Sequence, residues 1–456
     1  MGIVINTDLN SLALPESDLK WLNFVEKFDE LLKANSNYKP LRRTVFEMVI
    51  NDSVSANHSS NLRKYLSKSK STILRTLNRI NLKKCDIIIW QDIDRVYMWE
   101  TINRLQSLVK DSKQYSTVFV KPSLNHTQLH STPIPVYPKF QKKVSSNALK
   151  FTELIISSFK RDNCEQLILN LNNSFLEYEA YLEYFQYICK LVKPKLLFFT
   201  NDQYLPSAAF AFVAKQSKIK TFVIQHGATN PFQYPLQANK LLAWGKKDVA
   251  YFRNIGIPEN SIVLIGSILH DEFCFLENNR VDKNKILLLS NGNNEERNGV
   301  LPQKAYEWLD KLKSDCGEKN EYYVRFHPSE MKKYRDYGRK FDLTLNHVSI
   351  AKAIELSDII IGYVSTSLLE SALSGRPVIQ ILSEGNPNLC RYHEDGIALG
   401  VHDYSDFKSI VEKLSFNVEY YRATSKSQNN HVKNYFCYHP VAGNKLKNEV
   451  ISDICS

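Results

Sequence analysis

Short apolar runs alternate with segments of helical periodicity along most of the chain. The runs are four to six residues long and rich in β-branched and aromatic side chains, which is typical of strands buried on both faces of a parallel sheet. Strands that alternate with helices favour an α/β fold with right-handed crossovers. In the N-terminal half the predicted strands are 85–90, 116–120, 195–200 and 220–224, and the predicted helices are 16–35, 61–82, 97–110, 147–160, 174–192 and 205–216.

The segment 228–245 has no periodicity and contains two prolines, so it is expected to hold a change of domain. A second strand–helix series is predicted to begin at about residue 240. The predicted domains are 1–237, 238–415 and a C-terminal helical piece, 416–456, whose last helix packs back on the first domain. The second series has predicted strands at 241–244, 262–265, 285–290, 322–326, 358–361 and 377–381.

Composition places the chain among soluble globular proteins. Of its 456 residues 43% are hydrophobic and 23% are charged, and no apolar run approaches the roughly 20 residues of a membrane span. The first residues lack a basic stretch followed by an apolar core, so no secretory signal is expected. The eight cysteines show no Cys-x-x-Cys spacing, which favours free thiols in a reducing cytoplasm.

The net charge of +11 is partly local, because residues 63–84 carry basic side chains and no acid. Three interpretations remain open: a solvated helical face, a surface that meets anionic lipid or an anionic glycan, and a nucleic-acid surface. Nucleic acid is the least favoured, because neither interleaved aromatic residues nor a known motif accompanies the charge. The chain is therefore expected to be cytoplasmic, with peripheral contact to the inner membrane through 63–84 as an open alternative.

Two predicted strands of the second series end in groups that suit a phosphate. Ser365, Thr366 and Ser367 follow the strand 358–361 and begin an apolar helix, where free N–H groups and the helix dipole attract an anion. His327-Pro328 follows the strand 322–326 in the same way, with proline at the start of a helix. In a doubly wound sheet, strand ends of this kind hold a nucleotide.

Other residues near these strand ends have two open interpretations. Glu370 forms a capping box with Ser367 or meets hydroxyl groups of a donor. Asn291 and Gly292 follow the strand 285–290 and either approach a phosphate or form a surface turn. Arg325 immediately precedes Phe326-His327 and is a further donor-site candidate.

The catalytic candidates follow other predicted strands. Transfer of a group from a nucleotide donor to a hydroxyl needs a base for that hydroxyl or a carboxylate nucleophile. Asp202 and His226 are the first candidates, although Asp202 could instead cap the next helix and His226 could orient its loop. Gln225, Gly227 and Asp271 are further candidates in the same loops.

Metal chemistry has little support in the sequence. Asp92 and Asp94 form an Asp-x-Asp pair, which is frequent by chance, and no His-x-x-x-His pair is found. No Walker loop, dinucleotide fingerprint or serine-hydrolase elbow is present either. We therefore expect no metal and no cofactor besides the donor substrate.

With these motifs the chain resembles bacterial glycosyltransferases of the GT-B type, which have two Rossmann-like domains with a crevice between them. His327-Pro328 and Ser365-Thr366-Ser367 are similar to the motifs that bind CMP in bacterial sialyltransferases, polysialyltransferases and β-Kdo transferases. Gln225-His226-Gly227 resembles capsule Kdo transferases and CDP-glycerol glycerophosphotransferases. The resemblance covers about 195–385; the first 190 residues match no family, and the acidic motif that precedes His-Pro in several sialyltransferases is absent.

The resemblance implies a metal-independent transferase that moves a sugar from a CMP-linked donor to a glycan or glycolipid, such as capsule or lipopolysaccharide. Kdo is favoured and sialic acid is next. The donor is expected in the C-terminal domain and the acceptor in the N-terminal domain. Two alternatives stay open: a CDP-polyol phosphotransferase of polymer synthesis, and a non-catalytic nucleotide- or glycan-binding protein of an assembly complex.

Overall fold

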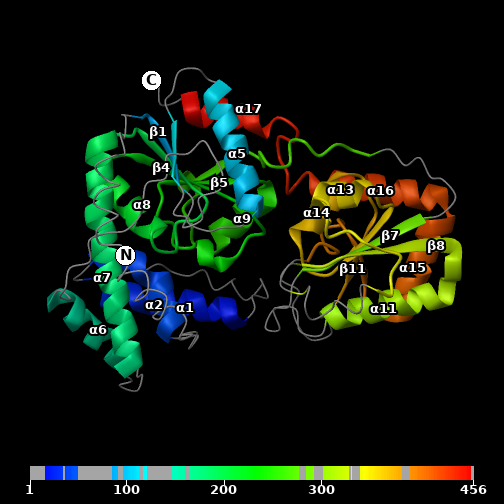
Figure 1. Cartoon of the computed structure of the whole chain (residues 1–456), viewed down its shortest axis with the longest axis horizontal. Coiled ribbons are helices and arrows are strands. Elements are labelled where there is room, and N and C mark those ends of the chain that lie inside the picture. Colours follow the sequence, from blue (N-terminus) through cyan, green and yellow to red (C-terminus); the bar gives the residue numbers. More distant parts are fainter. Residues whose placement is uncertain are drawn as a thin grey trace.

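The computed structural model contains two parallel sheets, each covered by helices on both faces (Figure 1). The two-domain α/β architecture predicted from the sequence, with two Rossmann-like domains, is confirmed. The segments that the structure describes are 16–33, 36–49, 85–90, 96–111, 117–120, 146–159, 165–276, 284–291, 301–327, 330, 339–382 and 391–452. The basic stretch 63–84, the pair Asp92 and Asp94, and the candidates Gly292 and Pro328 lie outside them.

The first sheet has the strand order β2-β1-β3-β4-β5-β6, with every pair parallel. The chain runs from β1 outward to β2 and then crosses to β3 on the other side of β1. The switch point of this sheet therefore lies between β1 and β3. The strands are β1 (Ile87–Trp90), β2 (Thr117–Val120), β3 (Leu196–Phe199), β4 (Lys220–Ile224), β5 (Lys240–Ala243) and β6 (Ile262–Leu264).

The second sheet has the order β12-β11-β10-β7-β8-β9 and is also parallel throughout. Its switch point lies between β7 and β10. The strands are β7 (Asn284–Leu289), β8 (Asn320–Arg325), β9 (Leu343–Thr344), β10 (Ile359–Gly362), β11 (Val378–Ile381) and β12 (Leu399–Val401). The short strands β9 and β12 were not predicted, because two or three residues carry too little periodic signal.

The prediction that the second strand series begins at about residue 240 is wrong. β5 pairs with β4, and β6 pairs with β5, so both strands belong to the first sheet. The change of sheet falls between β6 and β7. The cause of the error is physical: a buried parallel strand has the same apolar pattern in either sheet, and the pairing partner is not encoded locally.

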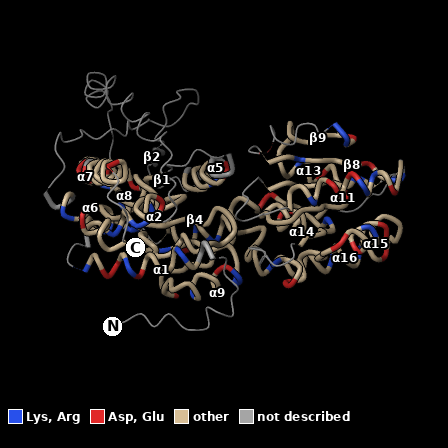
Figure 2. The backbone as a smooth tube through the Cα atoms, turned by 90° about the horizontal axis from the view of Figure 1, so that it is seen from below, with Lys and Arg blue, Asp and Glu red and all other residues tan. Residues whose placement is uncertain are grey.

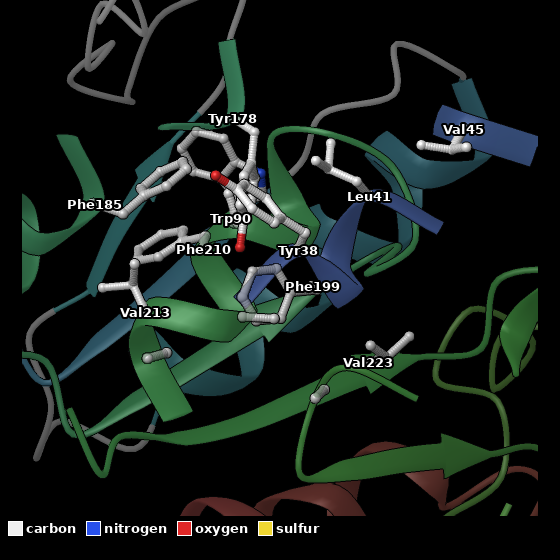
Figure 3. Packing of buried hydrophobic residues seen from close by; sticks show 14 of the residues in the cluster. Tyr38, Leu41, Val45, Trp90, Tyr178, Phe185, Phe199, Phe210, Val213 and Val223 are labelled. Atoms are coloured by element: carbon white, nitrogen blue, oxygen red, sulfur yellow. The ribbon is translucent and has the colours of Figure 1, made fainter. Parts of the chain in front are cut away.

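Both faces of each sheet are buried, as the continuous apolar runs predict. In β1, Ile88 and Trp90 pack on one side and Ile87 and Ile89 on the other. Figure 3 shows the first of these cores, where Phe185 stacks on Phe210 with ring centroids 4.1 Å apart. This core lies under the helices α1 (Glu16–Leu31), α2 (Arg42–Val49), α6 (Ser146–Ser158), α7 (Glu165–Val192) and α8 (Ser207–Gln216).

α7 begins nine residues before the predicted start at 174, since Leu167, Ile168 and Leu171 continue its apolar face. The second domain is covered by α11 (Leu301–Cys316), α13 (Ile350–Glu355), α14 (Thr366–Leu373), α15 (Tyr404–Phe416) and α16 (Val418–Val432). Basic and acidic side chains are interspersed along α15 and α16 (Figure 2), so these surfaces show no concentration of one sign.

The chain returns to the first domain after α16. The residues of α17 (Ala442–Leu446) and η6 (Lys447–Ile451) pack with α5 (Val96–Asp111) on one face of the first sheet, and Figure 1 shows α17 beside α5. α16 itself packs on α14 and α15 of the second domain. The predicted piece 416–456 is thus divided between the two domains.

At two glycines the returning chain passes too close for any side chain to fit. A Cβ atom on Gly245 would lie 2.3 Å from the carbonyl oxygen of Asn434, and one on Gly266 would lie 2.1 Å from that of Cys437. Gly266 also has a φ of 84°, which disfavours other residues. Residues 434–437 therefore cross closely over the ends of β5 and β6, and the two domains are joined by two crossings of the chain.

Candidate functional site

The switch point of the second sheet carries most of the predicted donor residues. Ser290 and Asn291 follow β7, and Tyr363 follows the neighbouring strand β10. The Tyr363 hydroxyl accepts a hydrogen bond from the Asn291 N–H at 3.0 Å and lies 2.9 Å from the Ser290 hydroxyl. These bonds tie the ends of β7 and β10 together at the position where doubly wound sheets bind their ligands.

Helix α14 begins at this switch point. Ser365 is its N-cap: its hydroxyl accepts from the Ser367 N–H at 3.2 Å and from the Ser367 hydroxyl at 2.7 Å. Thr366 is the first helical residue, and both Ser365 and Thr366 are half-buried, whereas Ser367 is buried. The predicted helix start is confirmed, and Ser365 and Thr366 are the hydroxyls that remain partly open to an incoming anion.

His327 lies at the end of β8, on the far side of β7 from β10. The segment is held by Asn346, whose amide oxygen accepts from the Phe326 N–H at 3.1 Å and whose amide nitrogen donates to the Phe326 carbonyl at 2.8 Å. His327 itself is exposed. The strand order therefore places His327 and Ser365 at the same edge of one sheet, two strands apart, or roughly 10 Å.

Arg325 and Glu330 lie close to His327 in the chain and are buried to different extents. Arg325 is half-buried and donates to the Leu345 carbonyl at 2.9 Å; burial lowers its pKa, and the charge of Glu370 opposes that change. Glu330 is fully buried and accepts from the Ser290 hydroxyl. Glu330 was not singled out in the sequence, because a glutamate three residues past a His-Pro pair has no signal of its own.

Of the two open interpretations of Glu370, the capping box with Ser367 is not found, because Ser365 is the N-cap of α14. Oε1 of Glu370 lies 3.1 Å from Nε2 of His270, a residue that follows β6 in the connection between the domains. His270 is 1% exposed and the Glu370 side chain is 12% exposed. The other carboxylate oxygen of Glu370, Oε2, is buried and has no hydrogen-bond partner in the described structure. Glu370 is thus the contact between the donor side of the second domain and the domain connection.

A second carboxylate, Glu100 of the first domain, lies near enough to Glu370 for their charges to interact. Glu100 lies one turn into α5, which follows β1 at the switch point of the first sheet. Burial, and next the negative charge of Glu370, raise the pKa of Glu100, while His270 acts in the opposite direction. Arg104, one turn further along α5, forms an ion pair with Glu272, so this face of α5 is directed at the connection that carries His270.

Asp202, the first catalytic candidate, is almost fully buried and holds the loop after β4. Its Oδ2 accepts from the backbone N–H groups of Gln237 at 2.7 Å and Ala238 at 2.8 Å, and its Oδ1 accepts from Gln203 at 2.7 Å. Burial raises the pKa of Asp202 to about 6, against these hydrogen bonds. This set of contacts gives Asp202 a structural role in the arrangement described here.

The Gln225-His226-Gly227 segment ends β4. Gln225 is buried; its amide oxygen accepts from the Trp244 N–H at 2.9 Å and its amide nitrogen donates to the Gly227 carbonyl at 3.0 Å. His226 and Gly227 are half-buried, and nothing lies within 4 Å of a Cβ placed on Gly227. His226 and Gly227 thus lie at the carboxyl edge of the first sheet, with open space beside Gly227.

Asp271 has a structural partner as well. Its two carboxylate oxygens accept from the N–H groups of Ala442 at 3.0 Å and Gly443 at 2.7 Å, at the start of α17. Asp271 therefore fixes the returning chain to the connection between the domains. Asp271 was a predicted site residue, whereas its neighbour His270 was not predicted.

A cavity of about 370 Å³ lies away from all of these residues. It is next to the beginnings of β3 and β4, at the amino edge of the first sheet, where parallel sheets do not bind their ligands. It therefore plays no part in the candidate site. The cavity at the amino edge of the first sheet is lined by Gln186, Cys189, Lys190, Lys193, Pro194, Ser217 and Ile219.

Among the described residues no group of three metal-ligating side chains is found, and no described helix is long and apolar enough to cross a membrane.

Comparison with known proteins supports the fold. No protein-family model and no curated protein matches the sequence. Among solved structures, the S. aureus MnaA–UDP co-structure matches with a TM-score of 0.52 and 14% identity, over 81% of this chain and 97% of that one. The Neisseria meningitidis UDP-GlcNAc 2-epimerase bound to UDP-GlcNAc matches with a TM-score of 0.50 and 12% identity, over 81% and 99%. At these identities the likeness shows the GT-B fold.

Proposed function

We propose that this GT-B chain is a glycosyltransferase that binds a nucleotide-sugar donor on its second domain. The observation that carries the proposal is the switch point between β7 and β10, where Ser365 and Thr366 open α14 beside Asn291. A helix N-terminus with two partly open hydroxyls suits the donor phosphate, and His327 at the same edge supplies a further N–H. The two solved structures named above contain UDP or UDP-GlcNAc, which agrees with a nucleotide ligand.

We further propose a cytidine nucleotide as the activating group and Kdo as the sugar, with sialic acid next. The support is the His327-Pro328 and Ser365-Thr366-Ser367 pair of motifs. The acceptor is a surface glycan or glycolipid that binds the first domain, and closure of the two domains excludes water from the transfer. Contact with an anionic membrane through 63–84 belongs to the same proposal.

The base that takes the acceptor proton is best sought at the junction of the domains. Both carboxylate oxygens of Asp202 accept hydrogen bonds within the first domain. A catalytic role for Asp202 would need those bonds to be broken. The charges of Glu370 and His270 act on Glu100, and its pKa lies above the ordinary 4.5 of a glutamate, which is the direction that strengthens a carboxylate as a base. We therefore add Glu100 to His226 as the leading candidates for the base.

The proposal is tested by donor turnover. The purified chain is incubated with CMP-Kdo, CMP-sialic acid or CDP-glycerol and a lipopolysaccharide or capsule oligosaccharide acceptor, and free CMP and product are followed by chromatography and mass spectrometry. We expect CMP release with a glycosidic product that contains no phosphate. A phosphodiester product would assign the chain to polyol-phosphate transfer, and nucleotide binding without turnover of any donor would contradict the catalytic assignment.

A further inference from the structure

His270 lies in the first of the two connections between the domains. This segment leaves β6, passes the Gly266 turn and reaches the second domain, where the Leu276 N–H donates to the Ser374 carbonyl at 3.0 Å. Phe275 covers Gly375, and a Cβ at that glycine would meet the Phe275 ring at 2.5 Å. The segment is therefore packed along α14, the helix whose N-terminus forms the proposed phosphate site.

The imidazole of His270 is held on all sides. Its Nδ1 lies 2.5 Å from the Ser267 hydroxyl and its Nε2 lies 3.1 Å from Oε1 of Glu370. The rings of Trp244 and Phe436 pack on it with centroids at 5.2 and 4.4 Å. Because an ionised carboxylate only accepts hydrogen bonds, Nε2 carries a hydrogen and donates it to Glu370. Both ring nitrogens have a partner, so the ring orientation is fixed.

This arrangement leaves one oxygen of Glu370 unused. Oε2 is buried and has no hydrogen-bond partner in the described structure, although leaving a buried acceptor without a partner is unfavourable. Glu370 lies four residues after Thr366 on α14, or about 6 Å along the helix. A carboxylate repels phosphate and accepts from hydroxyl groups, so its natural partner at this place is the hydroxyl-bearing part of the donor.

We propose that His270 is a positioning residue for the donor: it anchors Oε1 of Glu370 at the domain connection, so that Oε2 is aimed at the donor's ribose hydroxyls. The inference rests on the proposed function, since it presupposes a nucleotide on α14. It adds that the affinity for the nucleotide depends on a residue outside the donor domain. The domain connection and the donor site are then energetically linked, because a change at one alters the free energy of binding at the other.

The test is a calorimetric titration of the full chain with two probes, CMP and 2′,3′-dideoxy-CMP. The variants are His270→Ala, His270→Gln and Glu370→Gln, with His431→Ala as a matched control. His431 is an exposed histidine on α16 whose Nδ1 lies 2.8 Å from the Ser427 carbonyl oxygen. Near-UV circular dichroism and thermal melting establish that each variant is folded.

We expect His270→Ala to weaken CMP binding at least about tenfold, equivalent to about 1.4 kcal/mol, and to leave the binding of the dideoxy probe nearly unchanged. His270→Gln should recover part of the affinity, because its amide N–H can still donate to Glu370. The double variant His270→Ala/Glu370→Gln should lose little more than either single variant, since both act through the same contact. His431→Ala should bind both probes as the wild type does.

Three results would overturn the inference. One is wild-type CMP affinity in a folded His270→Ala chain. Another is an equal loss for CMP and for the dideoxy probe, which would show that His270 only supports the fold. If His270→Ala does not fold, wild-type CMP affinity in both His270→Gln and Glu370→Gln would overturn the inference instead. A wild-type chain that binds no nucleotide would instead remove the proposed function, and this inference with it.

Discussion

Nε2 of His270 lies 3.1 Å from Oε1 of Glu370, and this hydrogen bond joins the connection between the domains to the helix that opens the proposed donor site. Both side chains are buried or nearly so. The charges of the same pair act on Glu100 of α5. Charged groups of both domains thus act on one another at the domain connection.

The Ser365 hydroxyl should contribute to both stability and nucleotide affinity. Ser365→Ala removes the N-cap of α14 and is expected to cost about 1 kcal/mol of unfolding free energy, and also to weaken nucleotide binding. Ser349→Ala is the matched control, because Ser349 caps α13 through the Lys352 N–H. Denaturant unfolding should show similar losses for the two variants. Equal nucleotide affinity in both would contradict a phosphate role for Ser365.

His327 should affect binding without affecting the fold. It is exposed at the end of β8, so His327→Ala should leave the melting temperature near that of the wild type. Loss of a hydrogen bond to the donor phosphate should weaken CMP binding at least tenfold, or about 1.4 kcal/mol. Calorimetric titration provides the measurement. A folded variant with unchanged CMP affinity would remove His327 from the site.

Glu100→Gln should abolish transfer while nucleotide binding persists. Loss of the base at this position should lower kcat at least about 100-fold. The base acts in its ionised form, so the acidic limb of the pH profile of kcat/KM in the wild type should lie above pH 4.5, the ordinary pKa of a glutamate. Glu272→Gln, which changes the ion-pair partner of Arg104 on the same surface, is the control. Near-normal turnover of Glu100→Gln would direct the search for the base to His226.

Asp248 should make the stability of the chain depend on pH. This carboxyl, at the start of α9 (Lys246–Asn254), is buried, and burial raises its pKa from 3.8 to about 7. A pKa raised by folding stabilises the chain below about pH 4, and that stabilisation is lost as pH rises to about 7. Each unit of pKa corresponds to about 1.4 kcal/mol.

Asp248→Asn removes this titration. The unfolding free energy of the variant relative to the wild type should therefore increase between pH 4 and pH 7, as measured by urea unfolding at several pH values. The comparison at each pH cancels other titrating groups, such as Asp202, that are the same in both proteins. A difference between the two proteins that is constant over this range would contradict the account of Asp248.

The sequence predicts the strands well because each is a continuous apolar run, such as Ile359–Ile361 in β10. It cannot assign β5 and β6 to a sheet, since pairing is set by contacts far along the chain. The start of α14 follows from local capping chemistry at Ser365. His270 and Glu100 were not predicted, because their roles depend on a contact across the domains: one follows a strand without a motif, and the other lies on an ordinary amphipathic helix.

The central claim is that α14 and the ends of β7 and β8 bind the nucleotide of a sugar donor. The most direct measurement is a calorimetric titration of the full chain with CMP, CDP, UDP and GDP, accompanied by thermal melting, because a ligand that binds the native state raises its stability. The account predicts that CMP and CDP bind and raise the melting temperature most. Preference for UDP would contradict the cytidine donor, and the absence of binding by all four nucleotides would contradict the claim itself.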